Sequence, residues 1–181
     1  MIRSIAIIPA RSGSVRLKNK NNLKINNLTL IEHSIRAAIN SCKIKKIVFS
    51  SDCVHMLGIA KKYGIDLHKR PAHLASNTAT SEDLVLDILS EEKYSDYDEL
   101  ILLQPTSPLR KTFHIDECID LHRKQNNLST VSVTLQKNVF EVDKESNLIF
   151  KNDRLYISLN GAIFIRNIKD FIKRPSFIDK E

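Results

Sequence analysis

The stretch SIAIIPARSGSVRLKNKNN, residues 4–22, joins an apolar run to a long basic loop. The run SIAII is rich in isoleucine and predicts a short buried strand that ends at the proline. The loop carries four cations around a Ser-Gly-Ser turn: Arg11, Arg16, Lys18 and Lys20. A loop after the first strand of an α/β fold is a common anion site, so the stretch predicts phosphate binding. A solvated basic loop is the alternative.

Helical and strand patterns alternate over the rest of the chain. The strand-like runs are KKIVFSSD, IDLHKRP, ELILLQP, STVSVTL and GAIFI, with strands and turns over residues 139–158. Helical spacing predicts helices over residues 29–41, 54–63 and 112–124, and one that begins after Thr80. Alternation of this kind predicts an α/β fold with a mostly parallel sheet covered on both faces. We expect one domain, residues 1–181.

Capping residues predict where two helices begin, and the polar segments after three strands predict where a ligand binds. Thr80 and Asp83 are spaced as a capping box, and Thr112 is the expected N-cap of the fourth helix. Polar segments follow strands at Pro9, Ser51 and Gln104. In a parallel sheet these segments lie at the same edge, where ligands bind.

The charge, aromatic content and cysteines of the chain limit the kinds of partner that it is expected to bind. The 181 residues are 42% hydrophobic and 27% charged, with a net charge of +7. This charge suits a nucleotide, an acidic sugar, a nucleic acid or a membrane surface. Aromatic content is only 6%, so no stacking platform for nucleic acid is visible. The three cysteines have no paired metal spacing and indicate reduced thiols, and no segment is long enough to span a bilayer. We therefore expect a cytoplasmic protein without nucleic-acid or membrane partners.

Known phosphate and catalytic motifs are absent from the sequence. The first loop lacks the Walker A spacing and, with Gly13 alone, the dinucleotide fingerprint. The six histidines form no metal spacing, and no Ser-His-Asp arrangement follows from their order. Two further loops carry polar groups between prolines or small residues: LLQPTSPLR at 102–110 and RPAHLASNTATS at 70–81. Each is consistent with a ligand loop, or with an ordinary turn or helix cap.

Taken together, the three loops resemble one enzyme family. IIPARSGSVRLKNKN, FSSD, RPAHLASNTATS, LLQPTSPLR and NGAIFI occur in the order found in the cytidylyltransferases that activate sialic acids. The chain thus resembles the CMP-N-acetylneuraminic acid synthetase family, including relatives acting on legionaminic and pseudaminic acids. The resemblance implies a three-layer Rossmann-like nucleotidyltransferase fold. It also implies transfer of CMP from CTP to a nine-carbon 2-keto sugar acid, with release of pyrophosphate and Mg²⁺ as cofactor.

The resemblance also implies residue roles. Arg11 and Lys20 would neutralise the triphosphate as catalytic residues. The nucleotide-binding set is Arg11, Ser12, Gly13, Ser14, Arg16, Lys20, Asn21, Arg70 and Ser81. The substrate-binding set is Gln104, Thr106, Ser107 and Asn160. In such chemistry the protein mainly positions groups and stabilises charge.

Three departures from the family pattern affect these expectations. Val15 stands where the family has lysine, although Arg16 follows it. The segment from 135 to 159 is short and has no clear Arg-Gln match, so we expect the family's homodimer to be weakened. The family's Asp-x-Asp metal pair lies beyond the end of this sequence, and Asp179 and Glu181 align upstream of it. The metal ligands are therefore unknown, with Asp52 the first candidate.

Three functions remain open from the sequence. The first is an active sugar-acid cytidylyltransferase, for which the particular nonulosonic acid is undetermined. The second is a truncated or degenerate homologue that binds CTP with little or no turnover. The third is a basic nucleic-acid-binding protein. The sibling 3-deoxy-octulosonate cytidylyltransferase fits less well, because RSGS and QPTSPLR favour the sialic-acid side.

Overall fold

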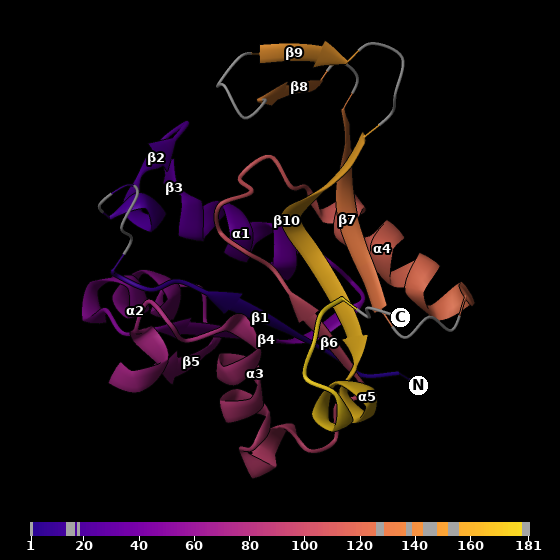
Figure 1. Cartoon of the computed structure of the whole chain (residues 1–181). Coiled ribbons are helices and arrows are strands. Elements are labelled where there is room, and N and C mark those ends of the chain that lie inside the picture. The colour runs from indigo at the N-terminus through magenta and orange to yellow at the C-terminus, as the bar shows by residue number, and fades with distance from the viewer. Residues whose placement is uncertain are drawn as a thin grey trace.

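A six-stranded sheet in the order β5-β4-β1-β6-β10-β7 forms the centre of the computed structural model (Figure 1). The model describes residues 2–13, 17, 19–125, 129–136, 139–142, 148–151 and 156–178. The sheet strands are β1 (Ser4–Pro9), β4 (Ile44–Ser51), β5 (Asp66–Lys69), β6 (Glu99–Leu102), β7 (Ser129–Gln136) and β10 (Tyr156–Asn167). The α-helices are α1 (Leu30–Ile39), α2 (Val54–Lys61), α3 (Ser81–Leu89), α4 (Thr112–Gln125) and α5 (Ile168–Lys173).

Shorter elements complete the chain. Two separate hairpins pair β2 (Lys24–Ile25) with β3 (Leu28–Thr29) and β8 (Val139–Val142) with β9 (Leu148–Lys151). Short 3₁₀ helices are η1 (Lys20–Asn22), η2 (Ala72–Ala75) and η3 (Glu92–Tyr94). The strands and helices expected from the sequence are present, with ends shifted by a few residues. Figure 1 shows the β8–β9 hairpin beyond the ends of β7 and β10.

The sheet is mostly parallel, as expected, with one strand reversed. β1 pairs in parallel with β4 on one side and β6 on the other, so that Ile7 lies between Val48 and Leu102. β10 runs antiparallel to both β6 and β7. The polar segments after β1, β4 and β6 therefore meet at one edge of the sheet.

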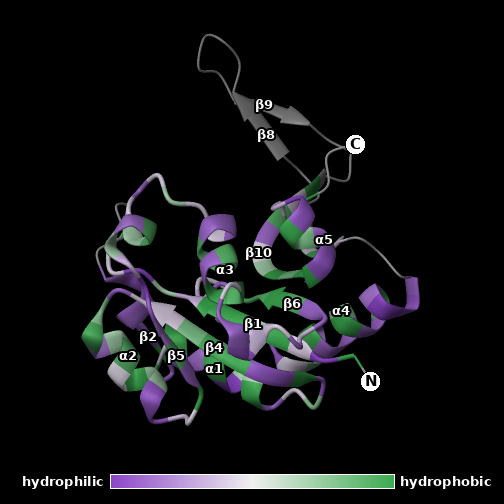
Figure 2. Ribbon diagram, turned by 90° about the horizontal axis from the view of Figure 1, so that it is seen from below, coloured by the Kyte–Doolittle hydropathy of each residue, from purple (hydrophilic) through white to green (hydrophobic). Residues whose placement is uncertain are grey.

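Both faces of the sheet are buried. In β1, Ile5 and Ile7 belong to one apolar cluster, whereas Ala6 and Ile8 belong to the other. The first cluster packs against α3 and α5, and the second against α1, α2 and α4. Figure 2 shows α3 and α5 on one side of β1 and β4, with α1 on the other. A strand covered on both faces explains why SIAII is continuously apolar.

Capping interactions fix the helix starts. Thr80 and Asp83 form the expected capping box, and Thr29 with Glu32 forms another at α1. The prediction for Thr112 was wrong: this residue lies inside α4, and its hydroxyl donates to the Ala37 carbonyl at 3.1 Å. The ring of His114 instead accepts from the backbone N–H of Lys111, the residue that precedes the helix, at 3.1 Å.

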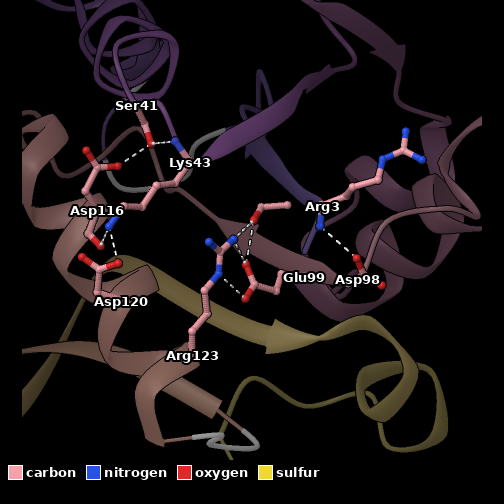
Figure 3. Close-up of polar contacts among 9 residues, drawn as sticks. Arg3, Ser41, Lys43, Asp98, Glu99, Asp116, Asp120 and Arg123 are labelled. Atoms are coloured by element: carbon pink, nitrogen blue, oxygen red, sulfur yellow. Dashed lines mark hydrogen bonds and ion pairs between the residues drawn. The ribbon is translucent and has the colours of Figure 1, made fainter. Parts of the chain in front are cut away.

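A buried ion pair fastens β6 to α4 at the edge of the sheet opposite the polar loops (Figure 3). Glu99 is 1% exposed, and both of its oxygens accept from the Arg123 guanidinium at 2.8 Å. The Ser4 hydroxyl of β1 donates to Glu99 at 2.6 Å and accepts from Arg123 at 2.8 Å. Nearby, Lys43 forms an ion pair with Asp120 of α4.

We predict that Arg123→Ala lowers the free energy of unfolding by about 3–5 kcal/mol, because it leaves the Glu99 carboxylate buried without its cation. Urea denaturation followed by circular dichroism measures the change. Asp96→Ala is the control: it breaks the exposed Arg3–Asp96 pair, which we expect to contribute less than about 1 kcal/mol. Equal effects from the two variants would contradict the assignment.

Candidate active site

A first cavity of about 260 Å³ lies beyond the carboxyl ends of β1 and β6. β4 and β6 flank β1 on opposite sides, so this is the point where the strand order reverses and where α/β sheets bind ligands. The cavity is lined by segments far apart in sequence: Pro9, Arg11, Lys20, Asn21, Arg70, Ala79, Thr80, Ser81, Leu84, Gln104, Pro105 and Thr106.

The first cavity is electropositive. Three of its lining residues are cations, Arg11, Lys20 and Arg70, and none of the described lining residues is acidic. The N-terminal end of α3 also faces it through Thr80 and Ser81. Backbone N–H groups at a helix N-terminus favour negative charge, as do the three cations. The cavity is therefore suited to an anion.

Asp52 anchors the basic loop to the end of β4. Its carboxylate accepts the Ser12 N–H at 2.8 Å and the Ser12 hydroxyl at 2.5 Å. Burial raises the pKa of Asp52, but these hydrogen bonds and the charge of Arg70 outweigh it, so the pKa lies below its ordinary value. The backbone N–H and the hydroxyl of Ser12 thus both donate to the Asp52 carboxylate.

Arg11 connects the basic loop to the segment that precedes α3. Its guanidinium donates to the Ser76 carbonyl at 2.6 Å and to the Asn77 side chain at 3.1 Å. The Arg11 carbonyl in turn accepts from the Asn21 amide at 3.2 Å. These bonds close the first cavity on one side and hold Arg11 on its wall.

Two buried polar atoms of the first cavity's lining residues lack a hydrogen-bond partner among the described residues. They are Nη2 of Arg70 and Oδ1 of Asn21, whose residues are 8% and 4% exposed. Burial lowers the pKa of Arg70 to about 10, although Asp52 opposes the shift. Buried polar groups are nearly always paired, so an unpaired donor and acceptor at one cavity indicate a polar ligand.

A second cavity, of about 630 Å³, adjoins the first and shares Thr106 with it. Residues 106–110 form one wall of the second cavity. The other walls come from α4, β7 and β10, through His114, Glu117 and Cys118, Ser132, Val133 and Thr134, and Asn160, Ala162 and Ile163. The sequence did not predict that side chains of α4 line this cavity, because residues on the surface of a helix form no recognisable motif.

The structure brings most of the expected site residues to these cavities. The first is lined by Arg11, Lys20, Asn21, Arg70, Ser81, Gln104 and Thr106, and the second by Thr106, Ser107 and Asn160. Ser12 instead binds Asp52, and Gly13 has open space around it. Ser14 and Arg16, like Val15, Lys18, Asp179 and Glu181, lie outside the described residues. The roles assigned to all of these residues remain predictions.

Asn160 and Gly161 lie in a bulge of β10, where Asn160 lines the second cavity and Gly161 lies against the Gln104 side chain. The Asn160 side-chain oxygen accepts from the Ser132 hydroxyl at 2.6 Å and the Ala162 N–H at 3.0 Å. Gly161 has a φ of +69°, and a Cβ there would lie 2.6 Å from the side-chain oxygen of Gln104. The positive φ favours glycine at this position, and the close approach involves only the end of the flexible Gln104 side chain.

Arg110 ends the proline-containing loop of residues 104–110 and holds it in place. Its guanidinium donates to the carbonyls of Gln104 at 3.0 Å and Ala162 at 2.6 Å, and to the Ser34 hydroxyl at 2.7 Å. The residue is 6% exposed, and burial lowers its pKa to about 10. The sequence offered LLQPTSPLR as a motif but gave this arginine no role.

The described residues contain no cluster of side chains that would hold a magnesium ion without the phosphates of a nucleotide. No group of three or more His, Cys, Asp or Glu side chains gathers among them, and the first cavity's described lining has no carboxylate. Asp52, the first candidate from the sequence, is directed at Ser12. No step of the chemistry is therefore assigned to a protein-bound metal.

Comparison with known proteins identifies the family. The cytidylyltransferase family model matches residues 5–171. The chain belongs to the cytidylyltransferase family. This cytidylyltransferase is 35% identical to the N-acylneuraminate cytidylyltransferase of Escherichia coli O18:K1:H7, over 97% of its own length and 45% of that protein. It is 34% identical to the CMP-N,N'-diacetyllegionaminic acid synthase of Legionella pneumophila, over 97% and 83% of the two chains.

The fold likeness extends to more distant enzymes. A solved CMP:2-keto-3-deoxy-manno-octonic acid synthetase complexed with CTP aligns with 99% of this cytidylyltransferase and 79% of that chain, at a TM-score of 0.69. At 15% identity this likeness concerns the fold alone. It confirms the expected Rossmann-like nucleotidyltransferase fold. The chain spans less than half the length of the E. coli relative.

We predict that Asp52→Asn destabilises the cytidylyltransferase by about 1–3 kcal/mol at pH 7, because an amide cannot accept both Ser12 donors. The pKa of Asp52 is lower in the folded protein than in the unfolded chain, where it is about 4. Ionised Asp52 therefore stabilises the folded protein fully above that pH, and this contribution is lost as the pH falls through the folded pKa. The difference between the proteins should therefore be full at pH 7 and shrink below about pH 4. Urea denaturation at a series of pH values tests this; a difference independent of pH would contradict it.

Proposed function

We propose that the chain transfers CMP from CTP to a nonulosonic acid and releases pyrophosphate. The observation that carries the proposal is the pair of adjoining cavities that share Thr106. The first, with three cations and a helix N-terminus, suits a nucleoside triphosphate. The second is larger, and its lining combines apolar side chains with the hydroxyls of Thr106, Ser107, Ser132 and Thr134 and the amide of Asn160, which suits a sugar. The 35% and 34% identical relatives named for acylneuraminate and diacetyllegionaminic acid support this substrate class.

In the proposed reaction the anomeric hydroxyl of the sugar acid attacks the α-phosphorus of CTP. A new oxygen–phosphorus bond forms, the bond to the β-phosphate breaks, pyrophosphate leaves and the hydroxyl proton is released. Arg11 and Lys20 offset the growing charge on the leaving group, and Arg70 and Ser81 contact the cytosine. Gln104, on the wall of the first cavity beside the shared Thr106, contacts the sugar acid. The protein thus contributes position and charge, which can account for several powers of ten in rate.

The remaining parts of the proposal concern cofactor, partners and location. Mg²⁺ is the proposed cofactor, bound by the phosphate oxygens of CTP. No nucleic acid or membrane partner is proposed. No helix among the described residues is long and apolar enough to cross a membrane. The three cysteines are free thiols, which supports a reducing, cytoplasmic location.

We expect pyrophosphate release when the chain is given CTP, Mg²⁺ and one member of a panel of sialic, legionaminic and pseudaminic acids. CTP alone should raise the melting temperature, because a ligand of the native state stabilises it. Stabilisation without release from any acid would indicate the alternative, a CTP-binding homologue without turnover. Equal stabilisation by CTP and ATP would contradict the assignment of Arg70 and Ser81 to cytosine.

Two alanine variants test whether Arg11 itself binds the phosphates of CTP. Arg11→Ala should weaken CTP binding by roughly 1.5–3 kcal/mol, as expected for a charge-assisted hydrogen bond to phosphate. Lys62→Ala is the control, since Lys62 is an exposed cation at the end of α2 and away from both cavities. Calorimetric affinities that fall equally in both variants would show a general effect of net charge.

A weak homodimer is also proposed. Val133 and Leu135 of β7 lie opposite Leu159 and Ile157 of β10, and all four side chains are 42–69% exposed. Such an apolar patch favours association. Sedimentation velocity should show a concentration-dependent dimer that Leu135→Lys dissociates. Val54→Lys, at an exposed position of α2, is the control. A monomer at all concentrations would contradict the proposal.

A further inference from the structure

Arg110 places an unneutralised charge at the wall of the second cavity. It lines that cavity, and its three hydrogen-bond acceptors, two carbonyls and the Ser34 hydroxyl, are all neutral. No ion pair joins it to a carboxylate of the described residues, and Nε has no hydrogen-bond partner among them. A buried cation without a counter-ion carries a large desolvation cost.

The first cavity provides a comparison. Arg70, its buried arginine, has the carboxylate of Asp52 close enough to act on its charge. Asp116 and Asp120 of α4 are bound to Ser41 and Lys43, so they do not neutralise Arg110. Glu117 lines the second cavity but is exposed to solvent. The field of Arg110 therefore reaches the second cavity, opposed there only by the solvent-screened charge of Glu117.

We propose that Arg110 selects the sugar substrate by the charge of its carboxylate. This inference rests on the proposed function and adds a specificity-determining residue to it. Arg110 acts through its field while its N–H groups stay bonded to the loop, to β10 and to α1. The buried Arg110 charge and a substrate carboxylate attract each other several times more strongly than they would in bulk water, because the protein between them has a lower dielectric constant. This charge therefore favours a sugar acid over a neutral sugar. CTP binds in the other cavity, which Arg110 contacts only through the Gln104 carbonyl, so its charge has little effect there.

The test separates the charge of Arg110 from its hydrogen bonds. Arg110→Lys keeps the charge and Arg110→Gln removes it, while both lose the forked geometry. Calorimetry measures the affinities of CTP, of N-acetylneuraminic acid and of its C1 carboxamide. We expect Arg110→Gln to weaken binding of the acid by roughly 10- to 100-fold and to abolish the preference for acid over carboxamide. Arg110→Lys should keep that preference, and CTP affinity should stay within about threefold in both.

Ser34→Ala is the matched control. It removes a hydrogen-bond partner of Arg110 and leaves the charge, so we expect a lower melting temperature and an unchanged preference for the acid. Equal loss of acid binding in the lysine and glutamine variants would overturn the proposal and assign Arg110 a structural role alone. So would a wild-type protein that binds neither form or does not prefer the acid. Acid binding without pyrophosphate release would contradict the proposed function but not this role of Arg110.

Discussion

The pairing of β1 with β4 on one side and β6 on the other is the constraint on which the site depends. Because both pairings are parallel, the segments after Pro9, Ser51 and Leu102 leave the sheet at the same edge. Asp52 from the second of these segments then binds Ser12 from the first. If β1 were an edge strand, the basic loop and the loop that begins at Gln104 would not share a cavity.

Two buried arginines complete this arrangement, one for each cavity. Arg70 follows β5 and lies beside Asp52, whereas Arg110 follows the proline-containing loop and bonds only neutral oxygens. Each places a positive charge in a region of low water content, where charge acts over a longer range than at the surface. Each cavity thus has a buried positive charge in its wall.

The sequence predicted most of the sheet because its strands are buried on both faces and are apolar at successive positions. Ile5 to Ile8 illustrate this, and the Thr80–Asp83 box fixed the start of α3. It could not predict the direction of β10, since strand direction depends on how the preceding connection runs. At α4, propensity favoured Thr112 as the cap, but the Ala37 carbonyl engages its hydroxyl. The loops of the site carried motifs, whereas Arg110 depends on Ser34 and Ala162, which are far away in sequence.

The reversed strand β10 affects how the chain is synthesised and folded. Residues up to about 125 contain β1, β4, β5 and β6, which can pair as soon as they leave the ribosome. The free edge of β6 stays open until Phe164 to Asn167 pair with it from the opposite direction. An open apolar edge invites pairing with other chains. The nascent chain is thus most exposed to misassembly just before β10 closes the sheet and brings Gly161 against Gln104.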